Sequence, residues 1–309
     1  MKFAARINSF LFQTQETVID AIEQCKKIEG LTHLEFNYPE HFKDTKTEDI
    51  KAHFGRLKVN GVATRFRNEF IGGEFSNRDP AIRTKAVKLG KEAVDACRTL
   101  GGDTVTIWQS YDGFDYPFQL DYEKAWNKIL SAIGEIADYA EDIKISIEYK
   151  PFEPRGTAVF DSIGTTLSAI KEMNRKNIGV TLDFCHMLMK HDSPAYALVQ
   201  AAHMNALYGL HLNDGDSFMD NGLIFGTINT SRAFEFVYYL KKYKYDGVIF
   251  FDTFPVREKA ADEIQANIEM LTAIDNAIDR VGLEVIEQTI NRQDGAAVQQ
   301  LIRSLMKNM

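Results

Sequence analysis

Short apolar runs recur along the chain and alternate with longer stretches in which apolar residues follow a helical period. The runs are rich in β-branched and aromatic side chains and are followed by turn residues, a pattern typical of buried strands. They predict strands at residues 2–7, 33–37, 62–66, 104–109, 145–149, 178–183, 207–212 and 248–252. The longer stretches predict helices at residues 17–28, 47–57, 80–100, 122–141, 162–173, 193–204, 231–242 and 260–281.

The order of these elements favours one fold class. Eight strands, each followed by a helix, are what a (β/α)8 barrel requires, and a doubly wound sheet rarely alternates so regularly. We therefore expect an α/β protein with a single (β/α)8 TIM barrel at residues 1–281. Residues 282–309 are expected to form a C-terminal extension with one extra amphipathic helix at 296–306, which covers the barrel or a neighbouring subunit.

Four consecutive predicted strands in the second half of the chain end in side chains that bind metals. These side chains are Glu148, Asp183, His211 and Asp252. In a parallel barrel the carboxyl ends of the strands face the catalytic mouth, so we expect the four side chains to meet there. Three carboxylates and one imidazole suit Mg²⁺, Mn²⁺ or Co²⁺ better than a thiol-preferring ion. The pattern predicts a divalent-metal enzyme.

The strand period supports this convergence. Side chains of a strand alternate between its two faces. The neighbouring positions on the other face are apolar, as in Ile147, Leu182, Leu212 and Phe251, and are expected to pack against the helices. The alternative is that each polar residue is only the exposed start of a loop, but four in phase on consecutive strands argue against it. Carboxylates buried together are costly without a cation, and a metal would supply one.

The composition is ordinary for a globular protein, and its charge narrows the range of partners. Of the 309 residues 45% are hydrophobic and 26% are charged, and the formal net charge is −8. An acidic balance speaks against general binding to nucleic acids or anionic membranes. Cys25, Cys97 and Cys185 form no C-x-x-C pair, which fits a reduced, cytoplasmic setting. No window approaches the roughly 18 apolar residues of a membrane span.

A more specific pattern lies at residues 148–156, which read E-Y-K-P-F-E-P-R-G. This segment resembles the E-x-K-P-x-E-P-R-G motif of xylose isomerase, and residues 183–186 are similar to the acid-x-x-His motif that comes next in that family. Weaker similarities occur in the same order at residues 73–79, 108, 222–226 and 251–257. The chain therefore resembles the xylose isomerase-like TIM barrel superfamily of sugar isomerases and epimerases, from about Gly61 to the end of the last barrel helix.

The resemblance implies a ligand set for a structural metal. The implied ligands are Glu148, Asp183, His211 and Asp252. In the xylose isomerases proper the strand-seven ligand is an Asp, whereas the rhamnose isomerase and ketose 3-epimerase branches have a His, as this chain does.

A second, catalytic metal of the isomerases would be held by Asp183, His186 and two acids in the loop after strand seven. In this chain the loop supplies Asp220, but Gly222 stands where the second acid is expected. Asp214 and Asp216 are nearby substitutes.

The resemblance also marks two differences near the substrate. The isomerases carry a substrate-binding His at the end of an early strand, where this chain has Asn37. The 3-epimerases need a Glu on strand eight, where this chain has Asp252.

Other candidates follow from their places beside the ligands. Lys150 shares a strand face with Glu148 and is expected to donate to a substrate oxygen, although such a pair is often only a solvated ion pair. Trp108 and Phe75 are candidates for an apolar wall around the reacting carbons, or for packing at the barrel rim. His186 is expected to be a second-metal ligand or a proton shuttle, or else to pack at a helix N-terminus.

These assignments give two predicted groups. The predicted catalytic residues are Lys150, Glu148, His186 and Asp252. The predicted substrate-binding residues are Trp108, Phe75, Asn37 and Asp220. Arg65 and Arg67 are candidates for gripping a phosphate or carboxylate, or for a structural role.

The favoured function is metal-dependent isomerisation between the aldose and ketose forms of a small sugar. A metal polarises a carbonyl and acidifies the neighbouring C–H, which permits an enediolate or a hydride shift. The alternatives are a ketose 3-epimerase, a C-glycoside deglycosidase-type lyase subunit with a small partner, and a binding subunit with a vestigial site. A homo-oligomer with a sugar substrate is expected, with no nucleic-acid or membrane partner.

Overall fold

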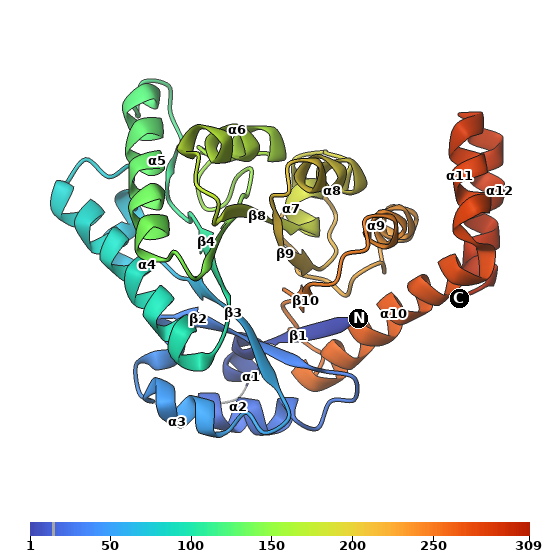
Figure 1. Ribbon diagram of the computed structural model, residues 1–309, viewed down its shortest axis with the longest axis horizontal. Helices are drawn as coiled ribbons and strands as arrows, with labels where there is room; N and C mark the ends of the chain where they lie inside the picture. Colours follow the sequence, from blue (N-terminus) through green and yellow to red (C-terminus); the bar gives the residue numbers. More distant parts are fainter. Residues whose placement is uncertain (14–15) are drawn as a thin grey trace.

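The computed structural model describes residues 1–13 and 16–309. In this part of the chain, eight parallel strands close into a barrel in the order β1-β10-β9-β8-β6-β4-β3-β2. The barrel strands are β1 (Lys2–Arg6), β2 (His33–Tyr38), β3 (Lys58–Thr64), β4 (Thr104–Trp108), β6 (Lys144–Glu148), β8 (Ile178–Asp183), β9 (Leu207–Leu212) and β10 (Val248–Phe251). Helices surround the closed sheet (Figure 1), so the predicted (β/α)8 barrel is confirmed.

Helical segments connect consecutive barrel strands. They are α1 (Ile7–Gln13), α2 (Val18–Cys25), α3 (Thr47–Ala52), α4 (Pro80–Leu100), α5 (Tyr122–Tyr139), α6 (Ile163–Met173), α7 (Phe184–Met189), α8 (Pro194–His203) and α9 (Thr230–Lys242), and α10 (Ala260–Val281) follows the last strand. Two 3-10 turns, η1 (Glu40–Phe42) and η2 (Asn68–Gly72), and a small antiparallel pair, β5 (Gly113–Phe114) with β7 (Thr157–Ala158), lie in the loops after barrel strands. None of the described helices combines the length and apolarity that crossing a bilayer requires.

The strands divide their side chains between the helices and the barrel interior. Ile147, Leu182 and Leu212 belong to the buried hydrophobic core that the strands share with the surrounding helices. On the opposite face, Ser146 and Thr181 share a hydrogen bond of 2.6 Å. This alternation is the one that the strand period predicts, and it directs polar residues at the strand ends into the barrel.

Strand β3 differs from its prediction, because it occupies Lys58–Thr64 and not residues 62–66. Gly61 lies within the strand, where an added Cβ would meet the backbone oxygen of Thr104 at 2.5 Å. Glycine here permits the close approach of β3 to β4, whereas an Asn-Gly pair in a sequence is typical of a turn. Arg65 therefore follows the strand and lies at the mouth of the barrel.

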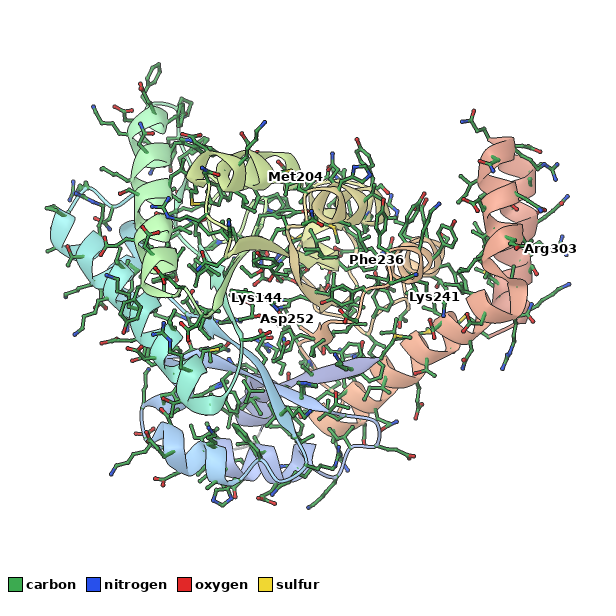
Figure 2. The ribbon with its side chains drawn as sticks, viewed as in Figure 1. Lys144, Met204, Phe236, Lys241, Asp252 and Arg303 are labelled. Atoms are coloured by element: carbon green, nitrogen blue, oxygen red, sulfur yellow. The ribbon has the colours of Figure 1, made fainter. Side chains whose placement is uncertain are left out.

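The C-terminal extension contains two helices, α11 (Leu283–Arg292) and α12 (Gly295–Lys307), where the sequence pattern predicts one. Helix α11 was not predicted, although its apolar residues Leu283, Ile286 and Ile290 recur at a helical spacing. Figure 1 shows the two helices side by side beyond α10, away from the strands. In Figure 2, Arg303 on this pair lies far from Asp252, which is near the middle of the barrel.

Gly61→Ala tests the close approach of β3 to β4. The new methyl group would meet the Thr104 backbone, so we expect the free energy of unfolding to fall by about 1–3 kcal/mol. Gly164→Ala is the matched control, because nothing lies within 4 Å of that position in α6. Denaturant unfolding followed by circular dichroism measures both variants. A transition midpoint of Gly61→Ala that is no lower than that of Gly164→Ala would contradict this strand register.

Candidate metal centre

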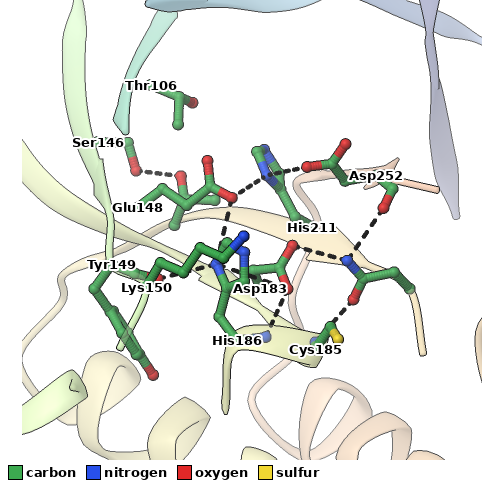
Figure 3. Close-up of polar contacts among 12 residues, drawn as sticks. Thr106, Ser146, Glu148, Tyr149, Lys150, Asp183, Cys185, His186, His211 and Asp252 are labelled. Atoms are coloured by element: carbon green, nitrogen blue, oxygen red, sulfur yellow. Dashed lines mark hydrogen bonds and ion pairs between the residues drawn. The ribbon is translucent and has the colours of Figure 1, made fainter. Parts of the chain in front are cut away.

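Four buried side chains converge at the carboxyl ends of neighbouring strands. Glu148 ends β6, Asp183 ends β8, His211 lies in β9 and Asp252 directly follows β10. One ligand atom from each residue lies within 4.8 Å of the others. Figure 3 shows the four side chains gathered in one place. The structure thus brings together the four residues that the sequence proposes as metal ligands.

The parallel register explains why these side chains meet. Asp183 is paired with His211 across β8 and β9, and His211 is paired with Phe250 across β9 and β10. The ring of Phe250 packs against the imidazole with 4.7 Å between the centroids. Asp252 lies two positions after Phe250 and therefore on the same face. The barrel strands, and not mobile loops, set the positions of the ligands.

Burial shapes the charges of the cluster. It raises the pKa of Asp183 to about 7, and neighbouring carboxylates act in the same direction. Burial also raises the pKa of Asp252, although Arg6 opposes this shift. Burial acts on Glu148 in the same way, but His211 lowers the pKa of that carboxyl to about 2. Carboxylates crowded in this manner gain from a bound cation, which replaces protons at the same oxygens.

One buried oxygen supports the fit of a cation. Asp252 Oδ1 forms an ion pair with Arg6 Nε at 2.9 Å, but this contact lacks hydrogen-bond geometry and neither atom has a hydrogen bond among the described residues. Buried polar atoms are seldom left without a partner, and an ion coordinated at this carboxylate would satisfy the oxygen. The residues present therefore fit a divalent ion that prefers oxygen ligands with one imidazole.

Glu35 on β2 is a part of the site that sequence reasoning missed. Its Oε1 lies 3.4 Å from His211 Nε2, and the residue is only 4% exposed. Burial lowers the pKa of His211, but Glu148 and Glu35 raise it well above its ordinary value. Because Nε2 faces Glu35, Nδ1 faces the ligand cluster, as in a carboxylate–histidine–metal arrangement. The alternation of Leu34, Glu35 and Phe36 is the sequence signal that indicates an inward-facing acid.

Asn213 holds the carboxylate of Asp183 in place by a hydrogen bond. Its Nδ2 donates to Asp183 Oδ2 at 3.0 Å and to the backbone oxygen of Asp252 at 3.1 Å. The other Asp183 oxygen accepts from the backbone N–H of His186 at 2.9 Å, so Asp183 also caps α7. Partners of this kind hold a ligand carboxylate in one direction.

A second polar cluster lies beside the four ligands. Lys150 Nζ lies 3.0 Å from Asp220 Oδ2 and 3.1 Å from Glu153 Oε2, and His186 Nε2 lies 3.2 Å from the same Asp220 oxygen. Burial lowers the pKa of His186, but Asp183 and Asp220 raise it to about 9. Burial also lowers the pKa of Lys150, but Asp220 and Glu153 raise it overall. The neighbouring acids therefore favour the protonated forms of both groups.

The acids considered for a second metal have other partners. Asp214 accepts hydrogen bonds from the backbone N–H groups of Ile228 at 2.8 Å and Asn229 at 2.9 Å. Asp216 is exposed and accepts from the backbone N–H of Phe218 at 2.9 Å. Among the described residues, the four ligands above are the one group of three or more His, Cys, Asp or Glu side chains that converges in this way.

A cavity of about 230 Å³ opens onto two of the ligands, Glu148 and Asp252. It is lined by Arg6, Arg65, Arg67, Trp108, Glu148, Lys150, His186, Asp220, Asp252 and Phe254. Trp108, predicted as an apolar wall, has Lys150 Nζ 5.6 Å and Arg65 Cζ 5.4 Å from its ring centroid. Arg6 and Phe254 were not among the predicted site residues, although Phe254 lies within the family-like segment at residues 251–257.

Two predicted substrate contacts lie elsewhere. Phe75 is fully buried, and its ring packs edge-on against Phe66 with 5.4 Å between the centroids. Asn37 is 5% exposed, and its backbone N–H donates to His41 Nδ1 at 3.0 Å. Neither Phe75 nor Asn37 is among the described residues that line the cavity, so their contact with a substrate stays a prediction.

The chain belongs to the xylose isomerase-like TIM barrel family, whose model matches residues 22–274. A xylose isomerase of Thermus thermophilus is 30% identical over 218 residues, which are 68% of this chain and 56% of that protein. The chain therefore spans little more than half the length of this curated relative.

Solved structures with the same fold include sugar-converting enzymes. A D-tagatose 3-epimerase-like protein superposes with a TM-score of 0.73 at 20% identity, over 91% of this chain and 100% of that chain. The IOLI protein with a bound zinc atom superposes with a TM-score of 0.71 at 19% identity, over 89% and 98% of the two chains. At these identities the likeness shows the fold alone.

The purified protein is expected to bind about one tight divalent ion through the four ligands. Asp183→Asn and His211→Ala should each remove it while the barrel stays folded, because each change deletes a donor. Since protons compete for His211 and Asp183, the affinity for the ion should rise as the pH rises. Metal analysis after gel filtration, with circular dichroism for folding, measures the loss.

Asp216→Asn is the matched control, since it changes an exposed acid in the loop after β9. Full metal occupancy in both ligand variants would contradict this site.

Proposed function

We propose that the chain is a divalent-metal-dependent isomerase that interconverts the aldose and ketose forms of a small sugar. The convergence of the four ligands beside the cationic Lys150 carries this proposal. Membership of the family and the similarity to a xylose isomerase support it. We propose Mn²⁺, Mg²⁺ or Co²⁺ as the ion because carboxylates dominate the ligand set. The zinc atom in the IOLI structure supports a divalent ion in general.

The chemistry divides between the ion and the protein. When bound, the ion would polarise the carbonyl of a hydroxy-carbonyl substrate and acidify the neighbouring C–H. Glu148 and Asp252 both line the cavity, so their carboxylates are placed to move a proton between adjacent carbons. Trp108 forms one wall of the cavity and keeps water from the reacting carbons.

Lys150 is placed to donate to a substrate oxygen. Its side chain is 9% exposed and is held by two carboxylates, so the ammonium group has a fixed direction. Asp220 accepts hydrogen bonds from both Lys150 and His186. The three side chains form a continuous path along which a proton can reach or leave the substrate oxygen.

A ketose 3-epimerase is the second candidate. His211, the ligand on β9, the seventh barrel strand in chain order, favours this reaction, and so does the likeness to a D-tagatose 3-epimerase-like protein. The shorter carboxylate of Asp252, where that reaction needs a Glu, favours isomerisation. A lyase step on keto-glycosides would use the same acidified C–H and belongs in the same substrate panel.

Lys150→Met tests the proton donor. If Lys150 stabilises developing charge on a substrate oxygen, kcat should fall by about 10²-fold or more while KM changes little. Metal content should match that of the unmodified protein, because Lys150 is not a ligand. Lys144→Met, at the exposed opposite end of β6, is the matched control. Unchanged turnover or loss of the ion would contradict the assigned role.

A substrate panel in D₂O separates the reactions. Aldoses, ketoses and keto-glycosides are assayed with each ion, and the products are analysed by NMR. Proton transfer through a carboxylate that exchanges with solvent should place deuterium at C1 or C2 of the isomerised sugar. Deuterium at C3 would favour the epimerase, and complete retention of the substrate hydrogen during isomerisation would contradict proton transfer.

A further inference from the structure

We propose that the natural substrate carries an anionic group, a carboxylate or a phosphate, and that Arg65 binds this group in the cavity. The inference rests on the proposed sugar-converting function and adds the substrate class. The cavity is lined by the metal ligands Glu148 and Asp252 and also by Arg65, which lies over Trp108. A short sugar acid or sugar phosphate is the chemistry that would use both.

Arg65 is the observation that carries the proposal. It follows β3 at the mouth of the barrel and is 7% exposed. Its Nη1 donates only a long hydrogen bond of 3.5 Å to the backbone oxygen of Thr64, and its guanidinium lies over the ring of Trp108. Among the described residues, no carboxylate oxygen lies within 4.0 Å of its guanidinium nitrogens. Glu148 and Asp252 interact with Arg65 only at longer range. A buried guanidinium without an acid in direct contact is unusual, because burial of an unpaired charge is costly.

The other cationic side chains of the cavity have acidic partners. Arg6 Nε lies 2.9 Å from Asp252 Oδ1, and Arg67 Nε lies 3.2 Å from Glu40 Oε1. Lys150 pairs with Asp220 at 3.0 Å. Arg65 is therefore the cation of this cavity, within the described chain, that is left to pair with an incoming anion. A guanidinium presents parallel N–H donors that match two oxygens of a carboxylate or phosphate.

The charge of the cavity points in the same direction. The whole chain has a formal net charge of −8, yet four Lys or Arg side chains and three carboxylates line this cavity. A divalent ion on the ligand carboxylates would make the cavity more positive. A concave positive site in an acidic protein attracts anionic ligands and repels cationic ones.

Trp108 supplies the readout for a binding test. The chain has two tryptophans, and Trp126 lies on α5 outside the cavity, where its Nε1 donates to Glu172 at 2.9 Å. Trp126→Phe therefore leaves Trp108, next to Arg65, as the single tryptophan, whose fluorescence is excited selectively. The Mg²⁺-loaded protein in this background is titrated with D-glucuronate, D-glucose 6-phosphate and D-glucose.

We expect at least one anionic sugar to bind at least about tenfold more tightly than D-glucose, since a bidentate charged pair adds this much affinity. Arg65→Met should remove that preference, so that the anionic sugar and D-glucose bind the variant with similar affinity. Added salt should weaken only the anionic ligand. Preference for glucuronate identifies a carboxylate, and preference for the phosphate ester identifies a phosphate.

Arg78→Met is the matched control, because Arg78 is an exposed arginine in the same loop after β3. Equal affinities for all three sugars, or an unchanged preference in Arg65→Met, would overturn the proposal. Loss of Mg²⁺ in Arg65→Met would also overturn it, because Arg65 would then serve to balance the ligand carboxylates. Binding is measured without turnover, so failure of the isomerase assay leaves this result interpretable.

Discussion

The structure depends on one electrostatic constraint, the confinement of three carboxylates and an imidazole inside the barrel. Glu148, Asp183, His211 and Asp252 are 4%, 1%, 2% and 6% exposed. Like charges at this depth repel one another with little screening by water, and a cation is the direct way to stabilise them. Two neighbouring groups are already paired with this cluster, because Glu35 contacts His211 and Arg6 contacts Asp252. The proposed chemistry depends on the same cluster, because the ligands Glu148 and Asp252 also line the cavity.

The barrel supplies the geometry that this constraint needs. Parallel strands end at one face, and their alternation places apolar residues against the helices and polar residues inside. The ligands therefore sit on rigid strand ends, while the segment after β6 and the loop after β9 bring Lys150 and Asp220 to the same cavity. Rigid ligands beside an ionised donor are what proton transfer at a sugar carbon requires, and they suit isomerisation and epimerisation alike.

The sequence predicted the barrel and the meeting of the four ligands because both depend on short-range periodicity. It did not place β3 correctly, since the close packing of Gly61 on Thr104 is a tertiary contact that overrides the local turn pattern of Asn-Gly. Glu35 was missed because an inward acid in the middle of a strand has no motif. Asp214 lay near enough in sequence to suggest a second metal site, but its direction is set by hydrogen bonds to Ile228 and Asn229, which the sequence does not reveal.

The central claim is that one divalent ion occupies the space between the four strand-end ligands. A crystal grown with Mn²⁺ and measured near the manganese absorption edge tests it directly, because anomalous scattering locates the ion without assumptions about activity. The account predicts one strong peak within bonding distance of Glu148, Asp183, Asp252 and His211 Nδ1. No peak there, or a peak between His186 and Asp220 alone, would contradict it.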